Sequence, residues 1–389
     1  MTSSQARLTP ALPDAAELPG LVTRFSVWLT DEALPFQLSH ARDEAGFHER
    51  IEPDGTPLAL PRRARVAARQ LYAFSRLVAL GIAPETGLAL GRHARSYLLA
   101  EHLGPEGAVI PVAGEPERFD LYDTAFALFA LAAADMRILP AGEAHALASA
   151  IRQRLEAGWR NCIAGFEEAM PRRLPLRSNP HMHTLEACLE WERTRPEDEN
   201  FARIADEIAG LCISRFRAPG TGALCEIFDG EWCPLSGPGS SIEPGHQYEW
   251  GWLLLRWGRL RGRADAVRAG IELIDLAEGH GINADGLAGS LLHADLTPAD
   301  MTARLWPQTE RIKAWALRAR MAGSREEARH AEAIAAEACA GLLRFFEHPL
   351  PGSWWENLGP GGRPIAEPAR TSSLYHIVAA YSELRLLAP

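Results

Sequence analysis

The sequence predicts an all-α protein in which about twelve helices pair into six hairpins that close into a ring. Three observations support this fold class. Alanine, leucine, arginine and glutamate dominate, and runs of alternating β-branched residues are scarce. Apolar residues recur at spacings of three and four, as in Leu71, Phe74 and Val78, which is the period of a helix. Short links between helices alternate with long ones. An open solenoid would show a repeat motif, and because we find none in the sequence we favour a closed ring.

The elements follow one another in a regular order. We expect helices over 20–40, 61–82, 86–102, 118–137, 140–158, 180–193, 197–216, 246–262, 264–281, 300–321, 323–346 and 370–387. Short links lie near 138–139, 194–196, 263 and 322, and long loops rich in glycine and proline lie near 103–117, 159–179, 217–245, 282–299 and 347–369. Short links join antiparallel neighbours, and long structured loops tend to carry function. We therefore expect the long loops to gather on one face of the ring.

Two of the long loops predict short strands. The turn-rich segment 281–299 is expected to hold a short hairpin. The segment 221–236 could supply two short strands around Asp229 and Gly230, because Asp-Gly is a hairpin signal. These strands would be additions to the helical ring.

The composition fits one globular domain. With 389 residues, 47% hydrophobic and 23% charged, the chain can form one large core. We treat 1–389 as a single domain, with a flexible segment over about 1–18. The formal charge of −10 argues against a nucleic-acid partner. No apolar run suits a signal peptide or a membrane span, so no membrane partner is expected.

The six cysteines are scattered and include no C-x-x-C pair. In a chain of this size, that pattern suggests reduced thiols and a cytoplasmic protein. The spacings do not match those of a zinc site, so no metal is predicted.

Four segments differ from an ordinary helical protein, and the first is SNPHMHTLEACLEWE. Ser178 or Asn179 is expected to cap a helix that has Pro180 at its first position. Asn179 and His183 are four residues apart and therefore share a helix face near its start. His181 and His183 do not share a face, which argues against a two-histidine metal site. The alternative is a cap followed by histidines that face solvent.

The second segment, EPGHQYEWGWLLLRW, contains His246, Glu249 and Trp250. A carboxylate three residues after a histidine can orient the imidazole and stabilise its charge. Such a pair would raise the basicity of His246, which suits a general base working near neutral pH. An exposed ion pair beside core aromatic residues is the alternative.

The third segment is ARLWPQTERIKAWA. Pro307 interrupts a helical pattern there and is expected to kink or restart the helix. Trp306, Gln308 and Glu310 lie around that break. We therefore count these three residues as candidates for the site.

The fourth segment, SWWENLGPGGRPIAEPARTSSLYHIVAAY, contains Trp355 before a loop and His376 near the start of the last helix. The chain has eleven tryptophans, and eight of them fall within the four segments. A sugar presents apolar C–H faces and a rim of hydroxyl groups, which flat aromatic rings and a few polar groups can bind. Ordinary core packing also uses tryptophan.

The stretches NPHMHTLEA, EPGHQYEW, RLWPQTE and SSLYH resemble the signature stretches of the N-acylglucosamine 2-epimerase family. They occur in the same order as in that family, and the resemblance extends from about Arg65 to His376. The family also includes mannose isomerases, proteins described as mannose-6-phosphate isomerases, and cellobiose epimerases. The resemblance implies a six-hairpin α/α toroid, also called an α/α barrel, with its active site in the central cavity.

The resemblance also implies roles for single residues. His246 and His376 match two catalytic acid–base histidines, and Glu249 matches a carboxylate that supports the first of them. Arg69, in ARQLYAFS, resembles an arginine that binds substrate oxygens. The full set expected to bind a sugar is Arg69, Tyr122, Asn179, His183, Glu249, Trp306, Gln308, Glu310 and Trp355.

Two departures from the family pattern leave the subclass open. The chain reads SGPGSSIE where some relatives carry an arginine shortly before the PGH motif. It has Tyr72 where isomerases of free mannose tend to have a histidine.

The expected chemistry is proton transfer at C2 of a hexose. Loss of this weakly acidic proton gives an enediolate, so a base and groups that stabilise an oxyanion are needed. His246 or His376 would take the proton, and Arg69 and His183 would stabilise the oxygens, so neither a metal nor a cofactor is expected. Return of the proton to C1 gives a ketose, and delivery to the opposite face of C2 gives an epimer.

The leading hypothesis is an isomerase that interconverts D-mannose and D-fructose, with a sugar as its partner and a homodimer left open. N-acylglucosamine 2-epimerisation comes second. Mannose 6-phosphate comes third, with Arg172, Arg173 and Arg177 as candidate phosphate donors. A glycoside hydrolase with paired carboxylates at Glu249 and Glu310, or a non-catalytic sugar-binding protein, would be alternatives from other classes.

Overall fold

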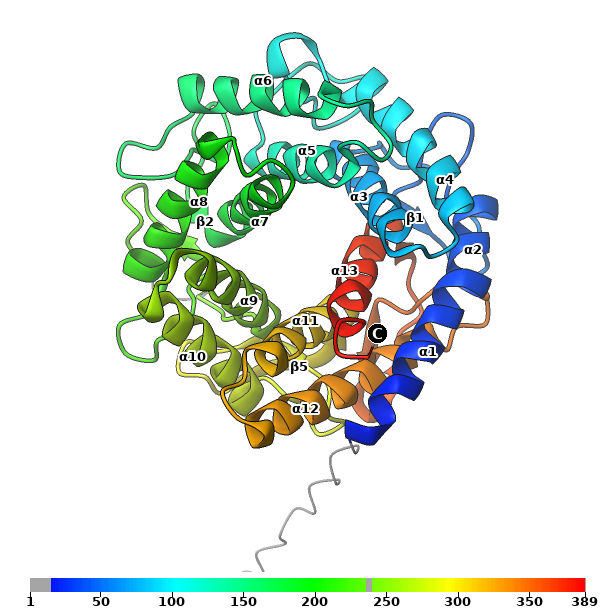
Figure 1. Ribbon diagram of the computed structural model, residues 1–389, viewed down its shortest axis with the longest axis vertical. Coiled ribbons are helices and arrows are strands. Elements are labelled where there is room, and N and C mark those ends of the chain that lie inside the picture. Colours follow the sequence, from blue (N-terminus) through cyan, green and yellow to red (C-terminus); the bar gives the residue numbers. More distant parts are fainter. Residues whose placement is uncertain (1–14, 236–239, 389) are drawn as a thin grey trace, which may run out of the picture.

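The computed structural model describes residues 15–235 and 240–388, and its helices form two concentric rings (Figure 1). The inner ring consists of α3 (Ala64–Leu80), α5 (Leu121–Ala134), α7 (Ser178–Thr194), α9 (Pro244–Arg261), α11 (Leu305–Met321) and α13 (Leu374–Leu384). The outer ring consists of α1 (Leu18–Trp28), α2 (Leu34–Ser39), α4 (Pro84–Tyr97), α6 (Glu143–Gly158), α8 (Glu199–Leu211), α10 (Ala264–His280) and α12 (Arg325–Leu343). The predicted α/α toroid is confirmed.

The ring closes through the two ends of the chain. Each inner helix packs against the next one, and α13 packs against both α11 and α3. The N-terminal helix α1 covers α12 and α13 from outside, which completes the sixth hairpin (Figure 1). Phe25 of α1 is fully buried there, with its ring centroid 5.6 Å from that of Phe346 and 5.3 Å from that of Tyr381.

The position of a helix in the two rings follows from its apolar pattern. Every residue of the inner helix α5 except Tyr122 is buried, because neighbours cover this helix on all sides. The outer helix α8 buries one stripe, which includes Phe201, Ile204 and Ile208, and leaves its other face to solvent. The inner helices are buried over most of their residues, polar ones included, whereas the outer helices bury a smaller part of their surface.

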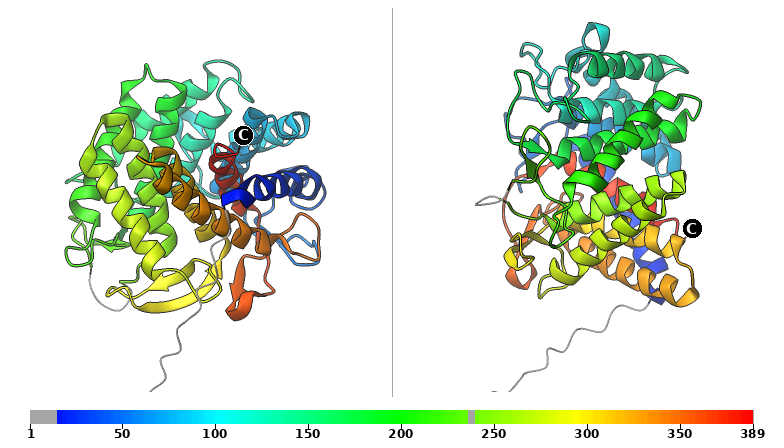
Figure 2. Two further views of the ribbon diagram at one scale, coloured as in Figure 1. Left: turned by 60° about the horizontal axis from the view of Figure 1, so that its bottom comes forward. Right: turned by 90° about the vertical axis from the view of Figure 1, so that its left-hand side faces the viewer.

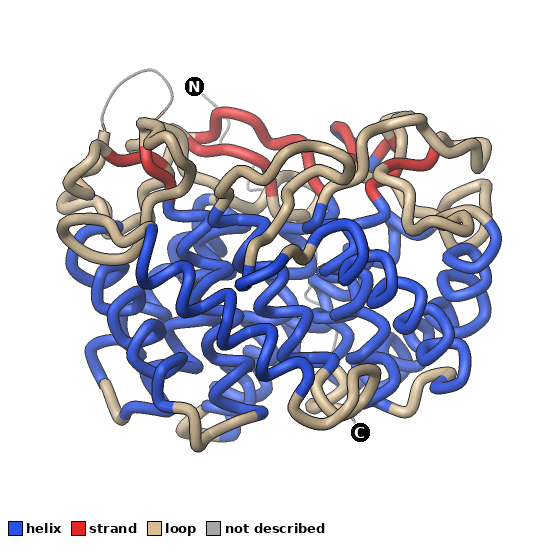
Figure 3. The backbone as a smooth tube through the Cα atoms, turned by 90° about the horizontal axis from the view of Figure 1, so that it is seen from above, coloured by secondary structure: helices blue, strands red, loops and turns tan. Residues whose placement is uncertain are grey.

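The long loops and all strands lie on one face of the ring, and short links lie on the other (Figures 2 and 3). On the loop face, β1 (Arg50–Ile51) pairs with β8 (Ala369–Arg370), and β2 (Leu176–Arg177) pairs with β3 (Ile227–Phe228). A four-stranded antiparallel sheet has the order β4 (Gly289–Leu292), β5 (Pro298–Arg304), β6 (Asn357–Gly359) and β7 (Arg363–Pro364). The predicted gathering of long loops on one face is confirmed.

The hairpin predicted within 281–299 is present as β4 and β5, but it is longer than expected. The prediction of a helix from residue 300 is wrong, because residues 300–304 pair with β4 and β6 as part of β5 and α11 begins at Leu305. In the segment 221–236, β3 finds its main partner in β2, and a single bridge from Phe228 to Pro234 closes the turn at Asp229.

The described residues begin inside the segment expected to be flexible. Residues 15–17 form a short 3-10 helix and α1 starts at Leu18, whereas 1–14 lie outside the described residues. Residues 236–239 of the SGPGSSIE stretch lie outside them as well. No helix within the described ranges combines the length and apolar character needed to cross a membrane.

Candidate active site

A cavity of about 280 Å³ opens on the loop face of the ring. Each inner helix contributes to its wall from residues in the first two turns. The lining residues are Arg50, Arg63, Arg65, Arg69, Tyr122, Asn179, His183, Glu243, His246, Glu249, Arg304, Trp306, Glu356, Arg370, Ser372, Ser373 and His376.

Eight of the residues expected at the site line this one cavity. They are Arg69, Tyr122, Asn179, His183, His246, Glu249, Trp306 and His376. They come from all six inner helices, so only the closed ring brings them together.

The other three expected residues lie behind the wall. The buried side chain of Gln308 bonds to the backbone of Ala288, whose N–H and C=O each lie 2.8 Å from it, so it fixes the loop before β4. Trp355 donates its indole N–H to the carbonyl of Glu347 and packs on His348. Glu310 is fully buried and contacts the cavity wall through His376.

His246 is held by carboxylates that the sequence pattern did not single out. Its Nδ1 lies 2.8 Å from Glu226 Oε2 and 4.0 Å from Glu243 Oε1, and its Nε2 lies 3.1 Å from Asn179 Nδ2. The expected pairing with Glu249 is wrong, because Glu249 faces His183 instead, at 3.8 Å. Burial lowers the pKa of His246, but the carboxylates outweigh it and raise that pKa to about 10.

His376 has the opposite electrostatic setting. Its Nδ1 lies 2.9 Å from Glu310 Oε1, so Nε2 is the nitrogen left for the cavity. Burial, together with the cations Arg69 and Lys313, holds the pKa of His376 well below its usual range. At neutral pH, His246 is therefore an imidazolium and His376 a neutral imidazole.

The indole ring of Trp306 lies near both histidines. Its centroid is 5.0 Å from the ring centroid of His246 and 5.9 Å from that of His376. The flat ring thus gives the cavity an apolar surface beside both imidazoles, as a sugar face requires.

The two histidines of α7 point to different places, as their spacing predicted. His183 lines the cavity, and its Nδ1 lies 3.1 Å from Glu186 Oε2. Burial lowers the pKa of His183 to about 4, so it is neutral. His181 is buried elsewhere, where its Nε2 accepts a hydrogen bond from the N–H of Phe166.

The start of α7 differs from the expected cap. The helix begins at Ser178, Pro180 is its third residue, and no side chain caps it. The reason is that Arg177, at the N-cap position, belongs to β2 and pairs with β3. Ser178 and Asn179 instead contact Glu226 and His246.

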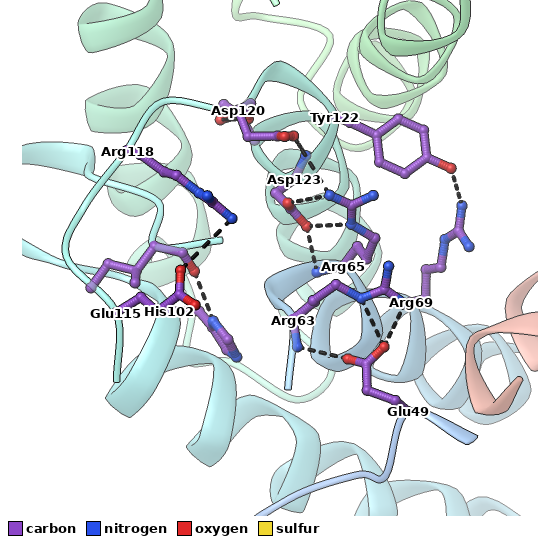
Figure 4. A network of polar contacts seen from close by, with 12 residues as sticks. Glu49, Arg63, Arg65, Arg69, His102, Glu115, Arg118, Asp120, Tyr122 and Asp123 are labelled. Atoms are coloured by element: carbon purple, nitrogen blue, oxygen red, sulfur yellow. Dashed lines mark hydrogen bonds and ion pairs between the residues drawn. The ribbon is translucent and has the colours of Figure 1, made fainter. Parts of the chain in front are cut away.

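Arginines from α3 and the segment before it line the cavity, and Figure 4 shows their polar contacts. Arg63 binds Glu49 and Arg65 binds Asp123, both through two guanidinium nitrogens. Arg69 donates to the Tyr122 hydroxyl at 2.6 Å and has no ion pair with a carboxylate among the described residues. The Arg69 guanidinium lies over Phe126 and Tyr375, 4.1 and 5.0 Å from their ring centroids.

Several residues of the site have only weak signals in the sequence. Arg65 lies four before Arg69 on the same helix face, and Glu243 lies three before His246, so spacing could have found both. Glu226 lies in a long loop 20 residues before its partner His246, and only the folded ring brings them together.

Two groups of side chains could hold a metal ion by distance alone. In each group the donor atoms lie within 4.8 Å of one another: His183 with Glu186 and Glu249, and His246 with Glu226 and Glu243. In both groups the Nδ1 of the histidine lies within hydrogen-bond distance of a carboxylate. This contact explains why the donor atoms lie close together without requiring a metal ion.

The fold, together with two histidines that line one sugar-sized cavity, defines a class of protein: helical-toroid enzymes that isomerise or epimerise carbohydrates. The sequence profile of the N-acylglucosamine 2-epimerase family matches residues 46–380. The chain is 40% identical over 372 residues to a mannose-6-phosphate isomerase of Rhizobium meliloti (strain 1021), covering 92% of this chain and 95% of that protein. The chain therefore belongs to the N-acylglucosamine 2-epimerase family.

Solved structures share the fold at low sequence identity. Cellobiose 2-epimerase from Bacillus thermoamylovorans B4167 superposes with a TM-score of 0.83 at 18% identity, covering 94% of this chain and 99% of that one. A D-mannose isomerase superposes with a TM-score of 0.80 at 17% identity, covering 97% and 100% of the two chains. A GH76 α-mannanase of Bacteroides thetaiotaomicron has a TM-score of 0.69 at 12% identity, covering 95% and 98%. The toroid thus occurs in both isomerases and hydrolases, and the site has to distinguish them.

Proposed function

We propose that the protein interconverts D-mannose and D-fructose, with His376 as the base and His246 as the acid. The relation to a D-mannose isomerase in fold and to a mannose-6-phosphate isomerase in sequence supports an aldose–ketose reaction. The observation that carries the proposal is the pair of histidines near Trp306, one of them cationic and the other neutral.

The reaction then takes two proton transfers at carbon and two at oxygen. His376 Nε2 takes the proton from C2, the C–H electrons form the C1–C2 double bond, and His246 protonates the carbonyl oxygen O1. His376 then returns its proton to C1 while His246 removes the proton from the C2 hydroxyl, and the ketone forms at C2. Both histidines end as they began, so the cycle is balanced.

Arg69 and His183 complete the site in this proposal. The Arg69 guanidinium has no carboxylate to neutralise it, so its charge is available to the oxygens of the enediolate. The Nδ1 of His183 is held by Glu186, which leaves Nε2 for a sugar hydroxyl. Asn179 lies beside His246 and would bind the same end of the sugar.

Proton NMR of the protein with D-mannose in deuterium oxide tests the function. We expect fructose to form, with deuterium at C1 to the extent that the proton on His376 exchanges with solvent before it returns to the sugar. We expect His246→Ala and His376→Ala to lose turnover while sugar binding persists. Conversion of N-acetylmannosamine without a ketose product would reassign the protein as a 2-epimerase. No conversion of mannose, N-acetylmannosamine or mannose 6-phosphate would overturn the proposed substrate class.

The cavity also favours a second candidate substrate, mannose 6-phosphate. Arg50 and Arg370 both line the cavity and face each other across β1 and β8. Like charges in opposite positions destabilise a strand pair unless an anion lies between them. Arg370 pairs with Glu356 at 3.1 Å, whereas Arg50 has no ion-pair partner among the described residues.

Of the arginines first expected to bind phosphate, Arg177 lines an adjoining pocket that shares Tyr122, Asn179 and His246 with the cavity. Arg172 binds Glu167 and the carbonyl of Gly230, and Arg177 binds Glu168. Neither these two nor Arg173 line the cavity.

Comparing kcat/KM for mannose and mannose 6-phosphate distinguishes the two substrates. If the phosphate is bound here, Arg50→Met lowers kcat/KM for the phosphorylated sugar by about 10- to 100-fold, the effect of losing a hydrogen bond to a charged group. The value for free mannose should not change, and Arg172→Ala serves as the control. Equal values for both sugars in every variant would exclude this phosphate site.

A further inference from the structure

Lys313 is the only lysine among the 40 basic residues of the chain, and it is buried beneath the active-site cavity. It lies on α11, three residues after Glu310, and its side chain has no exposed surface. A buried ammonium group is costly unless it is paired. The single lysine in an arginine-rich chain therefore occupies a position where its charge must be compensated locally.

The Lys313 ammonium joins two carboxylates that each hold a histidine of the cavity. Its Nζ lies 2.6 Å from Glu310 Oε2 and 3.6 Å from Glu186 Oε1. Glu310 Oε1 lies 2.9 Å from His376 Nδ1, and Glu186 Oε2 lies 3.1 Å from His183 Nδ1. Lys313 itself does not line the cavity, so it acts on a substrate only through these partners.

The surroundings of Lys313 allow no other role for its amine. The Nζ of Lys313 lies over the Trp252 ring, 4.1 Å from its centroid. Burial lowers the pKa of Lys313, but the carboxylates of Glu310 and Glu186 outweigh it and raise the pKa above its usual value. The amine therefore stays charged and is unsuited to attack a carbonyl group.

A charge count of the cluster explains why one cation is needed. Titratable and charged side chains from five inner helices surround Lys313. They are Arg69 from α3, Glu186 and His183 from α7, His246 and Glu249 from α9, Glu310 from α11, and Tyr375 and His376 from α13. Burial and Glu310 hold the pKa of Glu249 well above its usual range, so Glu249 is neutral. Two cations, Arg69 and Lys313, then balance two anions, Glu186 and Glu310, while the His246 imidazolium is paired with Glu226.

We propose that Lys313 is a positioning residue that keeps Glu310 and Glu186 anionic and thereby fixes the tautomers of His376 and His183. An anionic carboxylate can only accept, so each histidine must carry its proton on Nδ1 and present a bare Nε2 to the cavity. A neutral Glu310 could donate to Nδ1, which would move the histidine proton to Nε2 and remove the base. This inference rests on the proposed role of His376.

Lys313→Met tests the proposal because it keeps the approximate length of the side chain and removes its charge. We expect kcat to fall by about 10²- to 10⁴-fold, the contribution of a general base, with KM little changed. In ¹⁵N NMR of histidine-labelled protein, the His376 signals should change from the Nδ1–H to the Nε2–H tautomer. They can be identified by their loss in His376→Ala.

A matched control and a double variant separate positioning from mere stability. Arg311→Met removes another buried cation of α11, one that binds Glu278 away from the cavity, and should lower stability without changing the His376 tautomer. In Glu310→Gln, the amide oxygen accepts from His376 without needing a counter-ion. Adding Lys313→Met to that variant should therefore cost little more activity, so the two effects are not additive.

Three results would overturn the proposal: wild-type kcat in Lys313→Met, an unchanged His376 tautomer, or additive effects in the double variant. If Lys313→Met does not fold, the wild-type protein labelled with ¹⁵N-lysine still tests the proposal. The side-chain nitrogen of its single lysine must then be an ammonium at neutral pH. A neutral amine signal would contradict the proposal. The tautomer measurement needs no sugar, so failure of the proposed function would be recognised separately.

Discussion

The protonation states of His246 and His376 are set by what each Nδ1 contacts. Glu226 and Glu243 face His246, while His376 shares its carboxylate, Glu310, with the cation Lys313. The proposed acid and the proposed base are therefore the same type of side chain in two different electrostatic settings. This asymmetry is a property of the folded site, because the sequence distances from His246 to Glu226 and from His376 to Glu310 are 20 and 66 residues.

At this scale, Glu226→Gln should shift the pH dependence of kcat/KM. The raised pKa of His246, about 10, keeps it protonated until the pH rises through that value. Removing the nearest carboxylate should lower this pKa by about 1 to 3 units, so activity should decline at a lower pH on the alkaline side. Glu272→Gln, which changes a carboxylate on α10 that pairs with Arg217, is the control. An alkaline limb at the wild-type position would show that Glu226 does not set the charge of His246.

Helices were more predictable from the sequence than the strands or the partners of the catalytic histidines. Helical periodicity extends over many residues, so it located all twelve expected helical regions. The strand β5 was missed over 300–304 because its exposed first residues give no alternating pattern and its partners lie in β4 and β6. Eight residues expected from motifs near helix starts line the cavity, whereas Glu226 and Arg50 lie on loops or short strands whose positions only tertiary pairing decides.

Close packing between paired helices gives a prediction for α9 and α10. Gly251 and Gly270 face each other, and a Cβ at residue 251 would lie 2.6 Å from Ile274 Cγ1 and 2.9 Å from the carbonyl oxygen of Gly270. Gly251→Ala should therefore destabilise the protein by about 1 to 3 kcal/mol through overpacking. Denaturant unfolding measures this loss of stability.

The control is Gly210→Ala, on the open side of α8. The new methyl group meets nothing within 4 Å, so the free energy of unfolding should rise by about 0.5 to 1 kcal/mol. Destabilisation of both variants to the same extent would refute the packing argument.

The closure of the ring depends on the contact between its first and last helices. The last inner helix, α13, carries His376 and is covered by the first helix, α1. Closing the ring therefore links the N-terminal part of the sequence to an active site that includes residue 376.

Phe25→Ala tests this dependence. The fully buried ring contacts Phe346 and Tyr381, and its loss should lower the free energy of unfolding by about 3 to 5 kcal/mol. Thermal inactivation should occur at lower temperature, although the substitution lies outside the cavity. Val27→Ala, which removes two methyl groups from a side chain that is 50% exposed, should change stability by less than about 0.5 kcal/mol. Equal melting temperatures for Phe25→Ala and the wild type would show that α1 does not secure the ring.

The direction of the inner helices has a consequence for charge. All six begin at the cavity and run away from it, so their backbone dipoles point the same way. Each helix start is equivalent to about half a positive charge. Six such ends around one cavity create a positive electrostatic potential there in a molecule whose net charge is −10. An enediolate, formed from a neutral sugar, would be stabilised by the backbone itself. A hydroxamate anion that mimics the enediolate should accordingly bind more tightly than a neutral polyol of the same size, and equal affinities in calorimetry would show that this potential has no effect.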